Sequence, residues 1–217
     1  RITNPLEMFG VKFKTNKGKL PISINGTQTP RPIRYFENRG SAQCKSSVML
    51  AALNTPGTTI IKAKKSRNHT ELLFKYLNLP IRIIKKRSFD LIKIKGRKKI
   101  NPLNYKIPAD ISSSSFFITL AALSENSIIN IKNVNINPSR IGFLRIIKLM
   151  GVKIITKNSR LYKGERIADL MIKSKKKLNS INCPTNLNSA SIDEFLLIFL
   201  FAAKANGVSY FKKLSEL

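Results

Sequence analysis

The stretch of sequence that decides the fold is a unit that occurs three times. Its copies read SAQCKSSVMLAALNTPGTTII at residues 41–61, DISSSSFFITLAALSENSIINI at 110–131 and SIDEFLLIFLFAAKANGVSY at 191–210. Each copy begins with small polar or acidic residues, runs through an apolar helix that contains Ala-Ala, and turns into a strand. Recurrence at roughly 70 to 80 residues predicts one supersecondary unit that is used repeatedly.

The segments between these copies complete the unit as helix, strand, helix, strand, strand. Helices are expected at 41–53, 66–77, 110–123, 137–150 and from 191 onward. Strands are expected at 58–62, 81–85, 91–95, 128–132, 152–156, 170–173 and 207–210. A hairpin is expected at 11–25, and irregular chain at 26–40 and 158–166. Alternating helices and strands predict an α/β (α+β) architecture.

The net charge of +29, from 40 Lys and Arg against 11 Asp and Glu, suggests a nucleic-acid partner. The basic residues are, however, spread along the whole chain, and aromatic residues are not interleaved with them as a surface for single strands requires. We interpret most of the excess as solvated lysines that follow from the Lys-, Ile- and Asn-rich composition. Affinity for polyanions, or a general field that attracts small anionic substrates, remains as an alternative.

No membrane segment or disulfide is expected. The longest apolar run, residues 195–203, is too short to span a bilayer, and no charged-then-apolar leader opens the chain. Cys44 and Cys183 form no metal-binding pattern, and Cys44 is expected to serve as a small apolar side chain in a buried helix face.

Two polar groups in the first half could bind an anion. Ser41, Ala42 and Gln43 follow a glycine at a helix N-terminus, where a hydroxyl, free N–H groups and an amide suit a phosphate or a polyol. The alternative is an N-cap serine beside a solvated glutamine. Arg67, at the start of the next helix, could make a bidentate contact with phosphate or carboxylate, or could be a surface arginine.

The second half offers acidic residues at corresponding places. Asp193 and Glu194 are expected in the first turn of the third helix, where acids stabilise the helix dipole. An aspartate at such a position, facing a cleft, could equally act as a general base. Asp110 occupies the matching position of the second copy, and we expect it to cap its helix together with Ser112.

Together these segments resemble 5-enolpyruvylshikimate-3-phosphate (EPSP) synthases of the bacterial Ser-Ala-Gln variant. The resemblance is carried by NPL and MFGV at 4–6 and 8–11, SAQCKS at 41–46, LAALNTPG at 50–57, SRNHTE at 66–71, IPADISS at 107–113, NV and NPSR at 133–134 and 137–140, and IDE at 192–194. The order and spacing of the set hold over essentially the whole chain.

The resemblance implies a two-domain, inside-out α/β barrel built from repeated βαβαββ units. Residues 1–106 would be the C-terminal part of the substrate-binding domain, and 107–217 the first part of the domain that carries the catalytic aspartate, both incomplete. Because the chain resembles only the middle half of a family member, and lacks the family's N-terminal Lys-Ser and several arginines, we expect it to be inactive by itself.

The resemblance also implies an activity, the transfer of enolpyruvyl from phosphoenolpyruvate to the 5-hydroxyl of shikimate 3-phosphate. Ser41, Ala42, Gln43, Arg67 and Asp193 would bind shikimate 3-phosphate. Of these, Gln43 would also reach phosphoenolpyruvate, and Asp193 would accept the proton of the 5-hydroxyl. The family implies a cytoplasmic enzyme, monomeric at full length, with no cofactor, metal, membrane or specific nucleic acid.

One departure and two rival readings accompany this hypothesis. Asn68 stands where the family usually has Asp, next to Arg67. The sister transferase that acts on UDP-N-acetylglucosamine shares the fold, but would be expected to carry a reactive cysteine on a Gly-Cys loop, which neither Cys44 nor Cys183 matches. The second rival is a basic nucleic-acid-binding module, which salt-sensitive binding to arbitrary DNA would favour.

Overall fold

The computed structural model describes residues 1–174 and 177–214, and it divides into two compact units, Arg1–Leu103 and Asn104–Leu217. The first unit opens with helix α1 (Thr3–Glu7) and a hairpin of β1 (Lys12–Asn16) and β2 (Lys19–Asn25). Lys17 and Gly18 both have positive φ, 49° and 77°, which is the backbone of a two-residue hairpin turn.

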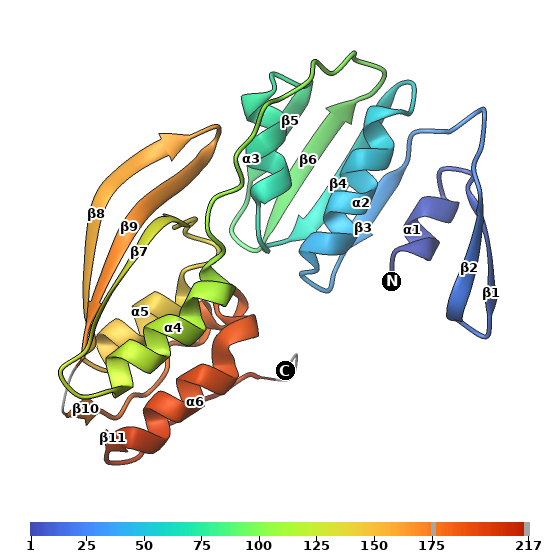
Figure 1. Ribbon diagram of the computed structural model, residues 1–217. Coiled ribbons are helices and arrows are strands. Elements are labelled where there is room, and N and C mark those ends of the chain that lie inside the picture. The colour runs from blue at the N-terminus through green and yellow to red at the C-terminus, as the bar shows by residue number, and fades with distance from the viewer. Residues whose placement is uncertain (175–176, 215–217) are drawn as a thin grey trace. The chain divides into compact units, whose positions relative to one another are not determined.

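A four-stranded mixed sheet forms the body of the first unit. Its strands stand in the order β3 (Arg34–Glu37), β4 (Thr58–Lys64), β6 (Phe89–Lys95), β5 (Ile81–Lys85). β3 pairs with β4 in parallel, and the other pairs are antiparallel. Helices α2 (Ala42–Leu53) and α3 (His69–Tyr76) lie on one face of the sheet (Figure 1). In chain order this is a complete βαβαββ unit.

Alternation along the strands explains why the helices cover that face. Ile61 and Ala63 of β4 and Ile92 and Ile94 of β6 are buried, and residues between them on β4 point to the other, more exposed face. They pack against the buried side of α2, where Met49 is fully enclosed. Because α2 follows β3, α3 follows β4, and the two strands are parallel, the N-terminus of each helix lies toward the end of the sheet where β3 and β4 stop.

The second unit repeats this topology. Its elements are α4 (Ile111–Leu123), β7 (Ile128–Asn135), α5 (Gly142–Leu149), β8 (Lys153–Tyr162) and β9 (Glu165–Lys173). The sheet order is β7-β9-β8, and Ala109 forms a parallel bridge to Val134 at the position that β3 occupies in the first unit. The same order of strands therefore recurs, with the first strand reduced to one bridge.

The third copy is shorter and lies in the second unit. It comprises β10 (Leu178–Asn179), the 3-10 turns η1 (Thr185–Ala190) and η2 (Ile192–Glu194), α6 (Phe195–Lys204) and β11 (Ala205–Asn206). β10 precedes α6 in the chain, β11 follows it, and the two strands pair with each other in parallel. Helix α6 packs against α4 and α5 (Figure 1). Phe195, Ile198 and Phe201 of α6 are fully buried in that contact.

The expected α/β class is confirmed, and two segments expected to be irregular are strands. Residues 34–37 form β3, because pairing with β4 satisfies backbone groups that a loop would leave to water. Residues 158–166 continue β8 and begin β9, joined by a turn at Lys163-Gly164. Within the described residues both main sheets are open, so the barrel implied by the resemblance is not closed there.

Three local expectations were wrong in the second unit. Helical spacing places Leu149 on the inward face of the helix expected at 137–150, but Leu149 is 56% exposed, whereas Phe143 and Ile146 of the same helix are fully buried. The helix expected from Ser191 begins at Phe195, because η2 precedes it as a separate 3-10 turn. The strand expected at 207–210 is reduced to a bridge between Tyr210 and Asn182.

Candidate functional site

The N-terminus of α2 has the form expected of an anion-binding helix end. The Ser41 hydroxyl accepts a hydrogen bond from the Cys44 amide at 3.3 Å, which confirms Ser41 as the N-cap, and donates to Gln43 Oε1 at 3.4 Å. Ala42 is the first helical residue, and the Gln43 side chain is exposed. The dipole and N–H groups of this helix end favour a negatively charged ligand.

The chain that leads into this helix is held by a buried carboxylate. Glu37, 1% exposed, accepts hydrogen bonds from the Arg39 amide at 3.0 Å and the Gly40 amide at 2.8 Å. Gly40 adopts φ 80°, a conformation that a side chain would strain. The segment from Glu37 to Gly40 therefore forms a compact turn that fixes where Ser41 begins the helix.

A buried ion pair joins the N-terminal ends of α2 and α3. Lys45 Nζ lies 2.6 Å from Glu71 Oε1, and the two side chains are 2% and 4% exposed. The same ammonium group donates to the Arg67 carbonyl at 2.8 Å. Beside it, the hydroxyls of Ser46 and Thr70 are 2.6 Å apart. The first turn of α2 thus holds the backbone that presents Arg67.

In the second unit the N-terminus of α4 carries an acid. Asp110 Oδ2 accepts from the Ser113 amide at 2.7 Å, which confirms Asp110 as the cap. Partial burial raises its pKa, but the Ser113 hydrogen bonds and the Arg140 charge outweigh that effect and hold the pKa below its usual range. Ser112 does not share the capping, because its hydroxyl bonds Glu194 and Arg140 instead.

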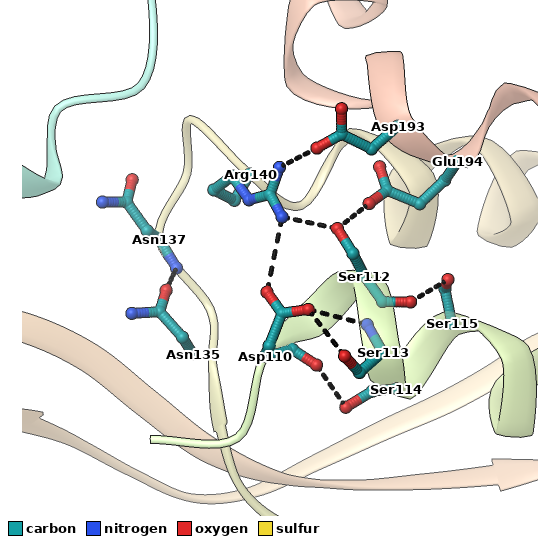
Figure 2. A network of polar contacts seen from close by, with 10 residues as sticks. All are labelled: Asp110, Ser112, Ser113, Ser114, Ser115, Asn135, Asn137, Arg140, Asp193 and Glu194. Atoms are coloured by element: carbon teal, nitrogen blue, oxygen red, sulfur yellow. Dashed lines mark hydrogen bonds and ion pairs between the residues drawn. The ribbon is translucent and has the colours of Figure 1, made fainter. Parts of the chain in front are cut away.

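Asp193 lies on η2, at the start of the third copy, and is bound to Arg140. Its Oδ2 atom lies 2.7 Å from Arg140 Nη1, a contact that Figure 2 shows. The Asp193 side chain is 43% exposed. The neighbouring Glu194 is buried and accepts a hydrogen bond from Ser112. A half-exposed carboxylate held on one side by a guanidinium is a group that can accept a proton from a bound hydroxyl.

The structure groups the sequence-predicted residues by unit. Ser41, Ala42, Gln43 and Arg67 belong to one unit, where Lys45 ties the α2 N-terminus to Arg67, and Asp193 belongs to the other. Among the residues that the structure describes, no group of three His, Cys, Asp or Glu side chains could hold a metal ion. No helix in the described ranges is both long and apolar enough to cross a membrane.

Sequence reasoning overlooked three charged residues, Lys45, Glu71 and Arg140. Lys45 and Glu71 lie within segments that carried the resemblance, but their pairing depends on helix packing. Arg140 had a readable signal. The dipeptide Ser66-Arg67 precedes α3, and Ser139-Arg140 stands at the same distance before α5.

Comparison with known proteins extends these local matches to the whole chain. The family model of EPSP synthase (3-phosphoshikimate 1-carboxyvinyltransferase) matches residues 1–217. The 3-phosphoshikimate 1-carboxyvinyltransferases of Ruthia magnifica subsp. Calyptogena magnifica and Rhodospirillum rubrum are 38% and 34% identical to this chain over its whole length. The chain covers 49% of each, so it spans about half the length of the curated relatives it matches.

Solved structures agree in fold. EPSP synthase from Acinetobacter baumannii aligns with 96% of this chain and 47% of its own, at a TM-score of 0.81 and 34% identity. The enolpyruvyl transferase NikO from Streptomyces tendae aligns at a TM-score of 0.69 over 95% of this chain and 49% of its own, with 15% identity, and supports the fold alone. Because the family match runs through both units and includes both capped helix ends, this chain belongs to the EPSP synthase (3-phosphoshikimate 1-carboxyvinyltransferase) family.

Proposed function

We propose that the protein containing this chain transfers the enolpyruvyl group of phosphoenolpyruvate to the 5-hydroxyl of shikimate 3-phosphate. A C–O bond forms between that hydroxyl oxygen and the enolpyruvyl carbon, the bond from this carbon to the phosphate oxygen breaks, and inorganic phosphate leaves. The hydroxyl proton must go to a base. The family match over the whole chain is the observation that carries this proposal.

The substrate roles follow from the chemistry of each group. Ser41, Ala42 and Gln43, at a capped helix N-terminus, suit the phosphate and hydroxyls of shikimate 3-phosphate, and Gln43 would also contact phosphoenolpyruvate. Arg67 supplies a fixed positive charge for the phosphate. Asp193 is the proposed proton acceptor and a contact of shikimate 3-phosphate, because its carboxylate is held but half exposed.

The two cysteines, Cys44 and Cys183, bear on the rival reaction with UDP-N-acetylglucosamine. Cys44 and Cys183 are 3% and 5% exposed, and burial raises the pKa of the Cys183 thiol, which disfavours the thiolate that a reactive cysteine requires. This weighs against a reaction on UDP-N-acetylglucosamine. The family resemblance further supports a cytoplasmic monomer that needs no cofactor and no specific nucleic acid.

The test uses the complete gene product, with calorimetry for shikimate 3-phosphate binding and phosphate release for turnover. We expect Arg67→Ala to weaken binding strongly, and Asp193→Asn to abolish most turnover while the protein stays folded. Arg82→Ala, an exposed arginine of the first unit, is the matched control and should bind normally. Failure of the wild-type protein to bind shikimate 3-phosphate, together with salt-sensitive binding to arbitrary DNA, would refute the proposal.

A further inference from the structure

Arg140 is a buried arginine that the proposed reaction does not yet use. It is 8% exposed and lies between β7 and α5. A charged group this deeply buried is stable only when it is paired and hydrogen-bonded. The groups that pair with Arg140 therefore indicate its role.

The loop before Arg140 is built to fix its backbone. Asn137, 1% exposed, accepts hydrogen bonds through Oδ1 from the Ser139 amide at 2.9 Å and the Ser139 hydroxyl at 2.8 Å, which is an Asx turn. Its backbone carbonyl accepts from the Arg140 amide at 2.8 Å, and its side-chain Nδ2 donates to Glu165 Oε2 at 3.1 Å. These hydrogen bonds fix the backbone from which the Arg140 side chain extends.

The guanidinium contacts side chains from two other segments (Figure 2). Nη1 lies 2.7 Å from Asp193 Oδ2, and Nη2 lies 3.4 Å from Asp110 Oδ1 and bonds the Ser112 hydroxyl. Ser112 in turn donates to Glu194, the neighbour of Asp193. Arg140 and Ser112 together connect the N-terminus of α4 to the turn that carries Asp193.

The repeat explains why an arginine stands here. Arg67 and Arg140 are each two residues before the second helix of their copy, and Ser41 and Asp110 cap the first helix of the same copies. The cap of the first copy, Ser41, is neutral. In the second copy the cap is a carboxylate, and Asp110 and Asp193 both pair with the arginine.

We infer that Arg140 is a positioning residue for Asp193 in the enolpyruvyl transfer, an inference that rests on the function proposed above. The planar fork of an arginine can hold one carboxylate oxygen while its second nitrogen is anchored elsewhere. That geometry restrains the orientation of the Asp193 carboxylate toward a bound hydroxyl. A displacement of about 1 Å in such a group is sufficient to lower turnover about 10²-fold.

The decisive measurement is kcat and KM of the complete gene product carrying Arg140→Gln. Glutamine can still form hydrogen bonds. Asp110 and Asp193, which lose their contacts with the guanidinium, are 53% and 43% exposed, so water can solvate them. We expect kcat to fall about 10²-fold while KM changes much less, because most of the groups proposed to bind shikimate 3-phosphate lie in the other unit and the Asp193 carboxylate itself is retained. The control is Arg145→Gln, an exposed arginine of α5, which should retain wild-type kcat.

A double-mutant cycle separates positioning from a merely structural role. If Arg140 acts through Asp193, then Arg140→Gln should cause no further loss of kcat in an Asp193→Asn background. Should Arg140→Gln fail to fold, Arg140→Lys takes its place. It retains the charge without the fork, and we expect it to be folded with kcat well below that of wild type.

Each outcome decides one question. Wild-type kcat in the folded Arg140 variant, or an equal loss of kcat with and without Asp193, would overturn the inference and leave the proposed function standing. Absence of turnover in the wild-type protein would refute the proposed function itself, and the inference would fall with it.

Discussion

Replacement of Lys45 by methionine is expected to destabilise the first unit strongly. Lys45 and Glu71 are 2% and 4% exposed, and Glu71 Oε2 has no hydrogen-bond partner among the described residues. Lys45→Met would therefore leave the carboxylate buried without its counter-charge. The Arg67 carbonyl would lose its donor at the same time.

The magnitude follows from the asymmetry of buried ion pairs. Removal of one partner costs about 3–5 kcal/mol, whereas replacement of both by apolar residues of similar size is often close to neutral. For a unit of this size class, 1 kcal/mol corresponds to a few degrees of Tm, so Lys45→Met should lower Tm on the order of 10 °C. Lys45→Met combined with Glu71→Leu should recover much of that loss.

The assay is thermal unfolding of the complete gene product, with near-UV circular dichroism to follow tertiary packing. Lys75→Met, an exposed lysine of α3, is the matched control and should unfold like the wild type. A Tm of Lys45→Met equal to that of the control would refute the reasoning. So would a double variant whose loss equals the sum of the single losses, because coupling within the pair predicts a smaller one.

The remaining predictions concern the second unit. The pKa of Asp110 is lower in the folded state than in the unfolded state. Its negative charge therefore stabilises the folded state at pH values above the unfolded pKa of about 3.9, and this contribution is lost as the pH falls through the folded-state pKa. The variant Asp110→Asn retains a capping oxygen but not the charge. The difference in unfolding free energy between wild type and this variant should therefore be constant near neutral pH and shrink in acid. A difference that is independent of pH down to pH 2 would contradict this expectation. In Gly142→Ala the new Cβ would lie 2.7 Å from the Ala190 carbonyl carbon, so we expect a loss of about 1–3 kcal/mol in urea unfolding and a fall in turnover, and an unchanged midpoint would refute the clash. Phe143→Ala removes a fully buried ring from its edge contact with Phe201 and should cost about 3–5 kcal/mol by the same assay, with a loss below 1 kcal/mol counting against it.

Local chemistry was readable from the sequence. Ser41 and Asp110 were expected to cap helices and do so, because a helix end leaves N–H groups that a side chain three residues upstream can satisfy. The family followed from ordered motifs, each formed by residues close together in the chain, and the whole-chain comparison confirms it. The substrate roles of Ser41, Ala42, Gln43, Arg67 and Asp193 remain predictions.

Pairing between distant segments was not readable in the same way. The strand Arg34–Glu37 carries little local strand signal after two prolines, and its parallel partner β4 lies beyond helix α2. The length of β8 and β9 likewise results from cross-strand pairing, which the polar residues at 158–166 did not indicate.

The sequence by itself determined the repeated unit, the helix ends and the family, because each depends on residues near one another in the chain. Only the tertiary structure decided which charges meet. Arg140 reaches Asp110 and Asp193 across 30 and 53 residues, and Lys45 meets Glu71 from a different helix. Such pairs form where packing removes water from both partners, and burial of that kind is a property of the assembled layers rather than of any single segment.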